Sequence, residues 1–150
     1  MPVDGARLIE MRVEWQFHMI SDSRAVRDGL QRALEAEPLC LLSVDDRSTA
    51  EIVLAEVLNN IVEHAYAAGT GPIRLSLALG EGVLNCRIED EGAAMPGETL
   101  PAGRLPNPAD LPEGGFGWHL IRTLGHQLSY RRSGSTNQLR FSLPAERSGR

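Results

Sequence analysis

The alternation of apolar and polar residues predicts a strand and then a helix at the start of the chain. Apolar side chains occupy every second position over residues 11–19, a period of two that is typical of a half-buried strand. Apolar residues then recur at helical spacing until Pro38, which cannot continue a helix, so residues 22–37 are predicted to form an amphipathic helix. Its candidate N-caps are Ser21, Asp22 and Ser23, and its exposed side carries Arg24, Arg27 and Arg32.

A second, longer helix and a hairpin follow. Asp45 or Asp46 is the predicted N-cap of this helix, and Gly69 and Gly71 mark its end. Its buried face is predicted from an apolar set at helical spacing, which consists of Leu54, Val57, Leu58, Ile61, Val62 and Ala65. Two runs of alternating residues, 73–79 and 84–88, are joined by a turn at Gly80–Gly82 and predict a β-hairpin.

Residues 90–115 are rich in glycine, alanine and proline and show no period. A structureless segment of this length inside a compact domain is uncommon and usually functional, so residues 93–113 are predicted to form a lid. Trp118, Leu120, Ile121 and Leu124 then indicate a short helix. Two final strands, near 127–132 and 137–143, are joined by the turn Ser133-Gly134-Ser135.

The predicted order is strand, helix, helix, strand, strand, lid, helix, strand, strand. Helices packed on one face of a mainly antiparallel sheet bury the single apolar face of each of these elements. We therefore expect an α+β fold, a two-layer α/β sandwich with a mixed, mainly antiparallel sheet. The length favours one domain over residues 1–150, with its core at about 11–143.

The composition excludes several classes of function. The 15 basic residues are all arginines and face 20 acidic ones, which gives a net charge of −5. Without lysine there is neither a Schiff base to pyridoxal phosphate nor a phosphate-loop lysine, and the acidic balance argues against nucleic-acid binding. Cys40 and Cys86 are too few for a disulfide framework, and no apolar run is long enough to span a membrane. We expect a cytoplasmic protein with reduced cysteines.

A polar stripe on the second helix is the first candidate for chemistry. Glu56, Asn60 and His64 are spaced four apart, so at about 100° per residue they share one face. A solvated helix face is the alternative reading. The adjacent pair Asn59-Asn60 favours a function, because asparagine is a poor helix former and its presence in mid-helix has a local cost.

Two glycine motifs accompany the stripe. Asp90 stands at the end of a predicted strand, two residues before Gly92, although aspartate and glycine are also common in plain turns. The cluster Gly114-Gly115-Phe116-Gly117 opens the next predicted helix, where backbone N–H groups can approach an anion. A simple hinge is the alternative for this cluster.

In this order the three motifs resemble a family of ATP-binding domains. Glu56-x-x-x-Asn60-x-x-x-His64 resembles its N box, Asp90-x-Gly92 its first glycine box and Gly115-x-Gly117 its second. The family is the GHKL group, with its Bergerat-type fold, shared by histidine kinases, type II topoisomerases, heat-shock chaperones and mismatch-repair ATPases. The local sequences at 56–66 and 114–121 are most similar to the anti-sigma-factor serine kinases of bacterial partner-switching systems, and the resemblance covers about 11–143.

The resemblance implies ATP and Mg²⁺ as cofactors and assigns residues to them. Asn60 would bind Mg²⁺ through its amide oxygen, Asp90 would accept a hydrogen bond from the adenine amino group, and Gly92 would let the purine approach the backbone. Gly115 and Gly117 would place backbone donors at the phosphates. Thr136 resembles the family's hydroxyl near the adenine, although a β-branched residue at a strand start explains it equally well.

The resemblance also implies an activity. Glu56 matches the position of the general base that accepts a proton from a serine or threonine hydroxyl, whereas His64 is left outside the catalytic set. Many relatives have a basic residue beside the second glycine box, where this chain has Pro112-Glu113; Arg104 in the lid is a possible substitute. A nucleotide-sensing binding module without useful catalysis is therefore the alternative function.

The implied partners are proteins. They are an anti-sigma antagonist of the STAS type, which is the phosphate acceptor, and a sigma factor. Arg24 and Arg27 lie on the helix where related proteins grip such partners, although a solvated face explains these arginines nearly as well. A homodimer is also implied, through the strand at 11–19 or the flat side of the sheet. Membranes and nucleic acids are not expected partners.

Overall fold

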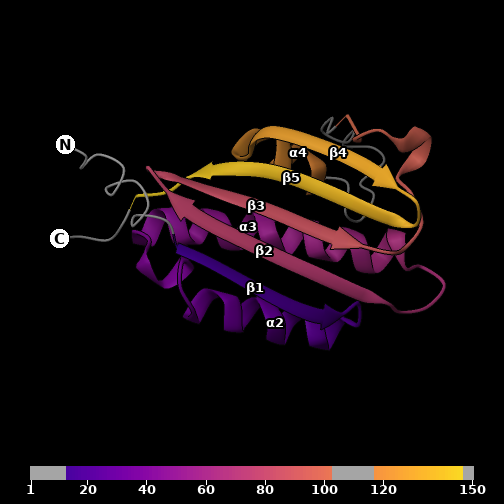
Figure 1. The fold of residues 1–150 in the computed structure, drawn as a ribbon, viewed down its shortest axis with the longest axis horizontal. Coiled ribbons are helices and arrows are strands. Elements are labelled where there is room, and N and C mark those ends of the chain that lie inside the picture. Colours follow the sequence, from indigo (N-terminus) through magenta and orange to yellow (C-terminus); the bar gives the residue numbers. More distant parts are fainter. Residues whose placement is uncertain (1–12, 103–116, 147–150) are drawn as a thin grey trace, which may run out of the picture.

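A computed structural model of the chain describes residues 13–102 and 117–146, which form two layers (Figure 1). One layer is a five-stranded sheet in the order β1-β2-β3-β5-β4, and helices α2, α3 and α4 cover one of its faces. The elements are β1 (Val13–Ile20), α2 (Ser23–Glu35), η1 (Leu39–Leu41), α3 (Val44–Asn60), η2 (Ile61–Ala65), β2 (Pro72–Gly80), β3 (Val83–Asp90), η3 (Pro96–Glu98), α4 (Gly117–Leu124), β4 (His126–Ser133) and β5 (Thr136–Pro144). The predicted α+β sandwich and its order of elements are confirmed.

Every pair of neighbouring strands in this sheet is antiparallel. β1, β2 and β3 follow one another in space as in sequence, but β5 and not β4 lies beside β3. The register of that pairing sets Asp90, at the end of β3, directly opposite Asn137 near the start of β5. Two polar residues from distant parts of the sequence thereby meet on one edge of the core.

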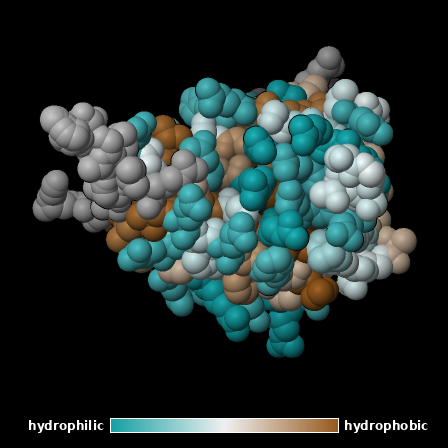
Figure 2. Space-filling view, in the orientation of Figure 1, coloured by the Kyte–Doolittle hydropathy of each residue, from teal (hydrophilic) through white to brown (hydrophobic). Residues whose placement is uncertain are grey.

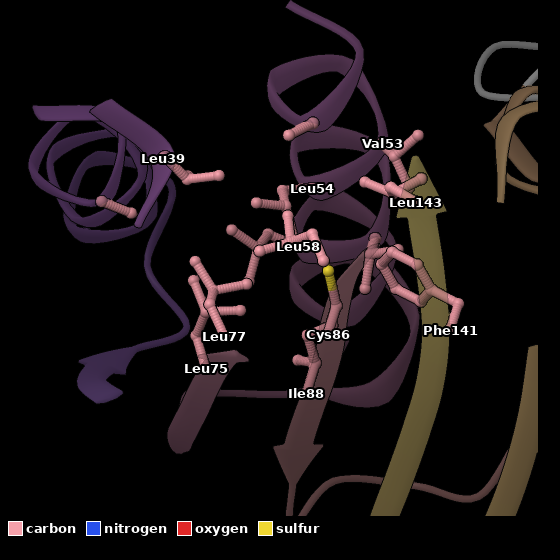
Figure 3. Close-up of a cluster of buried hydrophobic side chains, with 14 of the residues drawn as sticks. Leu39, Val53, Leu54, Leu58, Leu75, Leu77, Cys86, Ile88, Phe141 and Leu143 are labelled. Carbon is pink, nitrogen blue, oxygen red and sulfur yellow. The ribbon is translucent and has the colours of Figure 1, made fainter. Parts of the chain in front are cut away.

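The core lies between α3 and the sheet (Figure 3). Leu54 and Leu58 point from α3 toward Leu75 and Leu77 on β2, and all four side chains are buried. Cys86 is buried in the same cluster, and its burial raises the pKa of the thiol, which keeps it protonated. The alternating pattern of the strands is therefore satisfied by one helix-covered face.

Both long helices begin and end close to the predicted positions, but one predicted cap is wrong. Asp22 caps α2, which ends at Glu35, two residues before the predicted end. For α3 the cap is Ser43, whose Oγ accepts a hydrogen bond from the Asp46 N–H at 3.2 Å. Asp45 and Asp46 lie inside the first turn of α3, and the carboxylate of Asp46 accepts a hydrogen bond from the Glu146 N–H just after β5.

A π-helical turn, η2, ends the long helix and was not predicted. The N–H of Tyr66 bonds to the carbonyl oxygen of Ile61, five residues earlier, at 3.0 Å. Single π turns are rare and occur frequently at functional sites. This turn leaves the carbonyl oxygen of Ala65 free of the helix, where it accepts the N–H of Ala93 at 2.8 Å. The turn thus joins the end of the helix to the segment after β3.

No helix of the described residues covers the other face of the sheet, which is largely hydrophilic in the view of Figure 2. A shallow hollow of about 530 Å³ lies on it, lined by residues from all five strands. Arg87 and Arg140 are direct cross-strand partners there, and the Nε atom of Arg87 is buried without a hydrogen-bond partner. Among the described residues, no helix is long and apolar enough to cross a bilayer.

Candidate functional site

A cavity of about 450 Å³ opens between the end of α3, the ends of β3 and β5, and the segment after β3. Its size is in the range of small-molecule sites, and its walls are mostly apolar with a few convergent polar groups, as such sites require. The apolar walls come from Val57, Ile61, Ile88, Met95, Pro96, Pro101, Trp118 and Leu139. The polar groups are Asn60, His64, Asp90, Tyr130 and Asn137.

Asp90 lies at one end of this cavity and is only 6% exposed. Its Oδ1 atom accepts hydrogen bonds from the N–H of Gly92 at 2.9 Å and from Nδ2 of Asn137 at 2.8 Å. Within the described residues, all hydrogen bonds of this carboxylate go to Oδ1, so Oδ2 remains an acceptor for a ligand. Burial raises the pKa of Asp90, while Asn137, the Gly92 N–H and the charge of Arg132 act in the opposite direction.

Asn137 uses both sides of its buried amide. Besides Asp90, Nδ2 donates to the carbonyl oxygen of Ala93 at 2.9 Å. The Oδ1 atom accepts from Nη1 of Arg132 at 2.9 Å and from the hydroxyl of Tyr130. One side of the cavity is therefore formed by a connected hydrogen-bond network of four side chains, Asp90, Asn137, Arg132 and Tyr130, each of which has a partner.

The same network fixes the segment that follows β3. Nη1 of Arg132 donates to the carbonyl oxygen of Gly92 at 2.8 Å, and the N–H of Met95 donates to the Tyr130 hydroxyl at 3.1 Å. Further along, Nε of Arg122 on α4 donates to the carbonyl oxygen of Pro101 at 2.7 Å. The first part of the predicted lid, from 93 to 102, is therefore held by hydrogen bonds, and the rest of it, 103–113, lies outside the described residues.

Gly92 lies against the helix and not among the residues that line the cavity. A Cβ atom at this position would stand 2.3 Å from the carbonyl oxygen of Ala65, far inside contact distance. The glycine lets the chain leave β3 close enough to η2 for the hydrogen bond between Ala93 and Ala65. The expected approach of a purine to Gly92 stays a prediction.

Asn60 lines the cavity from the end of α3, whereas Glu56, one helical turn earlier on the same helix, is not among the described residues that line it. Nδ2 of Asn60 is buried and has no hydrogen-bond partner among the described residues. A Cβ atom on Gly117, the first residue of α4, would stand 2.8 Å from Oε1 of Glu56 and 3.5 Å from Nδ2 of Asn60. Gly117 therefore lets α4 approach both side chains, and the predicted face of Glu56 and Asn60 is directed toward the start of α4.

His64 lines the cavity although its side chain is 74% exposed, and its Nε2 is 4.0 Å from Oε1 of Glu63. It lies in η2, so the π turn and not a continuous α-helix places it there. At the rim it can contact a ligand, but it does not touch the described network around Asp90. The stripe of three predicted residues thus divides into Glu56 and Asn60 on α3 and His64 on the following turn.

The structure corrects one assignment on β5. Side chains alternate along a strand, and Asn137 shares the buried face with Leu139 and Phe141. Thr136 consequently faces the open side of the sheet, away from Asp90, and does not line the cavity. Asn137 is the residue that the sequence reasoning missed. Its signal was a polar residue at an inward position in an otherwise apolar alternation.

Tyr130 and Arg132 on β4 were also missed. They are half-buried and alternate with exposed residues, but their side chains are polar and no position of this strand is fully buried. Two predicted residues, Gly115 and Arg104, lie outside the described residues. Their expected contacts with phosphate stay predictions.

The described residues fit a nucleotide. An amide N–H that is buried without a partner, such as Nδ2 of Asn60, needs an acceptor, and a phosphate oxygen is one. The free oxygen of Asp90 lies at the opposite, largely apolar end, where a base with an exocyclic amino group can donate to it. Within residues 13–102 and 117–146 no group of three or more His, Cys, Asp or Glu side chains is arranged to hold a metal ion. A cation here would depend on Asn60 and on oxygens of the ligand.

Comparisons with known proteins place this chain in a family of ATPase domains, which is consistent with a cavity that fits a nucleotide. The family model described as histidine kinase-like ATPase domain matches residues 20–143. A serine-protein kinase RsbW of Bacillus mycoides is 29% identical over 121 residues, which cover 77% of this chain and 72% of that protein. A serine/threonine-protein kinase BtrW of Bordetella bronchiseptica is 36% identical over 95 residues, which cover 62% of this chain and 67% of that protein.

A solved structure supports the fold. The crystal structure of the RsbU and RsbW domains of Rv1364c from Mycobacterium tuberculosis matches with a TM-score of 0.60 at 15% identity. The match covers 92% of this chain and 33% of that chain. At this level of identity the likeness concerns the arrangement of the elements, and the two-layer sandwich described above is common to both.

Proposed function

Because this chain belongs to the histidine kinase-like ATPase domain family, we propose that it is an ATP-dependent serine/threonine-protein kinase of the anti-sigma-factor type. One observation carries the proposal: a single cavity is lined by both Asp90 and Asn60, and within the described residues the Oδ2 atom of Asp90 accepts no hydrogen bond and the buried Nδ2 atom of Asn60 has no partner. The names of the relatives, serine-protein kinase and serine/threonine-protein kinase, support the choice of acceptor.

We call the part of the cavity at Asp90 and Asn137 the base end, and the part at Asn60 the phosphate end. At the base end, adenine enters between the apolar walls and donates its amino hydrogen to Oδ2 of Asp90. Ile88 and Leu139 line the cavity beside the carboxylate, and they exclude water from this hydrogen bond. A hydrogen bond to an ionised acceptor in such surroundings is stronger than one between neutral groups. The base end therefore selects the nucleotide and anchors it.

At the phosphate end, the Nδ2 group of Asn60 donates to a phosphate oxygen, and backbone donors at Gly115 and Gly117 hold the remaining oxygens. Mg²⁺, held by Oδ1 of Asn60 and phosphate oxygens, would neutralise phosphate charge when bound. Arg104 is the proposed side-chain cation from the lid. Because the chain has no lysine, arginine and the cation are its means of balancing the triphosphate.

Glu56 is the proposed general base. Its carboxylate lies one helical turn from Asn60 and against Gly117, at the end of the site where the γ-phosphate is expected. It would accept the proton of a serine or threonine hydroxyl as that oxygen attacks the γ-phosphate, with ADP as the leaving group. Most of the acceleration in such a transfer comes from positioning and charge stabilisation, which Glu56 shares with Asn60 and the lid.

Phosphate transfer tests the proposal directly. The protein is incubated with Mg-ATP and the small antagonist protein encoded beside it, and Glu56→Gln is compared with Glu63→Gln, an exposed glutamate in η2. We expect transfer to fall by roughly 100-fold or more in Glu56→Gln and to be unchanged in Glu63→Gln. Transfer by Glu56→Gln at the normal rate contradicts its role as base. Nucleotide binding without transfer by the unmodified protein leaves the nucleotide-sensing module as the function.

A thermal shift separates binding from catalysis. A ligand that binds only the folded state raises the apparent stability, so ADP with Mg²⁺ is expected to raise the melting temperature of the unmodified protein but not that of Asn60→Ala. Absence of a shift in the unmodified protein at saturating nucleotide contradicts ATP binding altogether. Because Asn60→Ala removes a group with no protein partner, the variant is expected to fold.

The proposed partners are an antagonist protein of the STAS type and a sigma factor. Arg24 and Arg27 lie exposed on α2 and offer a basic face to an acidic partner. Their replacement by glutamate is expected to weaken complex formation without changing nucleotide binding, as measured by calorimetry. Equal partner affinity in the double variant contradicts this surface.

We also propose that the chain forms a homodimer through the open face of the sheet. The hollow on that face is lined by residues of all five strands and carries Arg140 on β5. A second copy related by a two-fold axis would cover this hollow with the same surface of its partner. Arg140→Glu is expected to shift the mass measured by light scattering from dimer to monomer; an unchanged mass contradicts this interface.

A further inference from the structure

The residues behind Asp90 form a chain of contacts that the function proposed above does not use. Arg132 on β4 bonds to Asn137 on β5, and Asn137 bonds in turn to Asp90 on β3. Arg132 is the far member, and no hydrogen bond joins it directly to Asp90 within the described residues. Any influence of Arg132 on a ligand at Asp90 therefore passes through the amide of Asn137 or through charge.

The chemistry of arginine determines how that amide is oriented. A guanidinium has N–H donors and no acceptor, so the group that faces Arg132 must be the Oδ1 atom of Asn137. The Nδ2 atom is then directed to the other side, where its partners are Oδ1 of Asp90 and the carbonyl oxygen of Ala93. If the amide were reversed, two donors would meet at Arg132 and two acceptors would meet at Asp90.

Tyr130 completes this arrangement but does not determine it. Its hydroxyl accepts the N–H of Met95 and donates to Oδ1 of Asn137. A hydroxyl can either donate or accept, so Tyr130 by itself would tolerate both orientations of the amide. Arg132 is thus the member whose chemistry permits one orientation only.

We propose that Arg132, acting through Asn137, is a positioning residue for nucleobase selection: it holds Asp90 as an acceptor whose Oδ2 atom receives the exocyclic amino group of a purine. The inference rests on the proposed nucleotide binding and deepens it. A 6-amino purine donates to this oxygen, whereas a 6-oxo purine such as hypoxanthine presents an acceptor and is rejected. A site that leaves a buried polar group unpaired discriminates strongly against the wrong ligand.

Discrimination between 6-amino and 6-oxo purines depends on the charge state of Asp90, because a protonated carboxyl group can donate a hydrogen bond to the 6-oxo group. Burial raises the pKa of Asp90, and the charge of Arg132 and the hydrogen bond from Asn137 lower it. The other titratable groups facing it are Glu91 beside it, Tyr66 after η2, Tyr130 on β4 and His64 on the cavity rim. Loss of Arg132 therefore raises the pKa of Asp90 further and moves the loss of discrimination to higher pH.

The test compares the dissociation constants of ADP and inosine diphosphate by calorimetry at pH 6 and pH 8. The variants are Arg132→Gln, which can present either a donor or an acceptor to Asn137, and Arg132→Lys, which can only donate. Arg131→Gln is the matched control, since Arg131 is the neighbouring arginine and is exposed on the open face of the sheet. His64 is present in all four proteins, so its contact with a ligand is common to all of them.

In Arg132→Gln the preference for ADP over inosine diphosphate is expected to fall by about tenfold at pH 6, the order of one hydrogen bond, and to recover toward the unmodified value at pH 8. Arg132→Lys and Arg131→Gln are expected to keep the preference at both pH values. A purely structural role would weaken both nucleotides equally at both pH values, and that result overturns the proposal.

An unchanged preference in Arg132→Gln also overturns it, and circular dichroism of each variant establishes that the compared proteins are folded. Failure of the unmodified protein to bind either nucleotide overturns the proposed function itself. Binding of ADP by the unmodified protein together with an unchanged preference in Arg132→Gln overturns the role of Arg132 alone. The two failures are thus distinguishable.

Discussion

Two asparagines line the same cavity and differ in how their amides are used. Asn137, at the base end, has protein partners for both its nitrogen and its oxygen. Asn60, at the phosphate end, has a buried nitrogen without any partner among the described residues. A buried polar group without a partner costs free energy, so the two residues contribute to the free protein in opposite ways.

The difference indicates how each end recognises a ligand. The base end is organised before the nucleotide arrives, because Asp90 is held by Gly92 and Asn137 and needs no rearrangement. In the proposed function the ligand completes the phosphate end, because it supplies the acceptor that Asn60 lacks among the described residues. A pre-organised end is suited to selection between bases, since it needs no rearrangement when the ligand binds.

Gly92→Ala is expected to disrupt the base end most strongly. Its Cβ atom would stand 2.3 Å from a backbone oxygen of Ala65, which cannot move aside as a side chain could. We expect the free energy of unfolding in urea to fall by about 3 kcal/mol. Gly69→Ala is the control, because no heavy atom lies within 4 Å of its Cβ position. Equal stability of the two variants would show that the contact with η2 is not needed.

Asn137→Ala is expected to lower the free energy of unfolding by about 2 kcal/mol, since it leaves Asp90 and Arg132 each without one buried partner. Thr136→Ala, on the open face beside it, is the control and is expected to cost at most about 1 kcal/mol. Urea unfolding of both variants measures the difference. A larger loss in Thr136→Ala would contradict the assignment of the two faces of β5.

The pH dependence of Asn137→Ala sharpens the same test. Burial raises the pKa of Asp90 in the folded state, so its contribution to stability is complete below the ordinary pKa and is lost as the pH rises through the raised pKa. Removal of Asn137 raises this pKa further and extends the loss to higher pH. The stability deficit of Asn137→Ala is therefore expected to grow as the pH rises above the ordinary pKa of an aspartate. A constant deficit would mean that Asn137 does not act on the charge of Asp90.

Gly117→Ala is expected to change the phosphate end with little effect on stability. The added Cβ atom meets Oε1 of Glu56 at 2.8 Å, but that atom ends a flexible side chain and can move. We expect the free energy of unfolding to change by less than about 1 kcal/mol. Phosphate transfer is expected to fall much more than ADP affinity, because Glu56, the proposed general base, is displaced, whereas the adenine-binding part of the cavity around Asp90 is intact. Single-turnover transfer and calorimetry measure the two effects, and unimpaired transfer would contradict the position of Glu56.

Asn60→Ala is expected to have the smallest effect on stability. The variant removes a buried N–H without a partner, which offsets the packing that is lost, so the free energy of unfolding is expected to stay within about 0.5 kcal/mol. Urea unfolding of this variant beside Asn137→Ala compares the two ends directly. A loss as large as that of Asn137→Ala would show that Asn60 is satisfied in the free protein, and the contrast between the ends would fail.

Much of the fold could be predicted because its signals are local. The alternation in β1, β2 and β3 and the apolar face of α3 each specify one buried side, and the order of elements then leaves the two-layer sandwich as the arrangement that buries them. The predicted cap of α3 was wrong because Ser43, Asp45 and Asp46 are all suitable cap residues and local sequence does not choose between them. The π turn was missed because residues 61–65 continue the helical pattern, and its contact with Ala93 joins residues that are distant in sequence.

The candidate site could be predicted only in part, for a similar reason. Asn60 and Asp90 stand in recognisable local motifs, and the structure brings both to one cavity. Asn137 and Arg132 belong to no motif, and their importance comes from the antiparallel register that sets β5 beside β3. Thr136 was chosen because it resembles a hydroxyl of the family, whereas the alternation of the strand decides which of two adjacent residues faces the cavity.

The π turn also limits how this site can be transplanted. Glu56 and Asn60 follow the repeat of an ordinary α-helix, but the wider turn at Ile61–Ala65 puts His64 and the Ala65 carbonyl out of phase with that repeat. A designed straight helix with the same sequence spacing would reproduce the positions of Glu56 and Asn60, but it would direct His64 and the Ala65 carbonyl oxygen elsewhere. A graft of this site must therefore carry the π turn at Ile61–Ala65 together with Gly92, which packs against that turn.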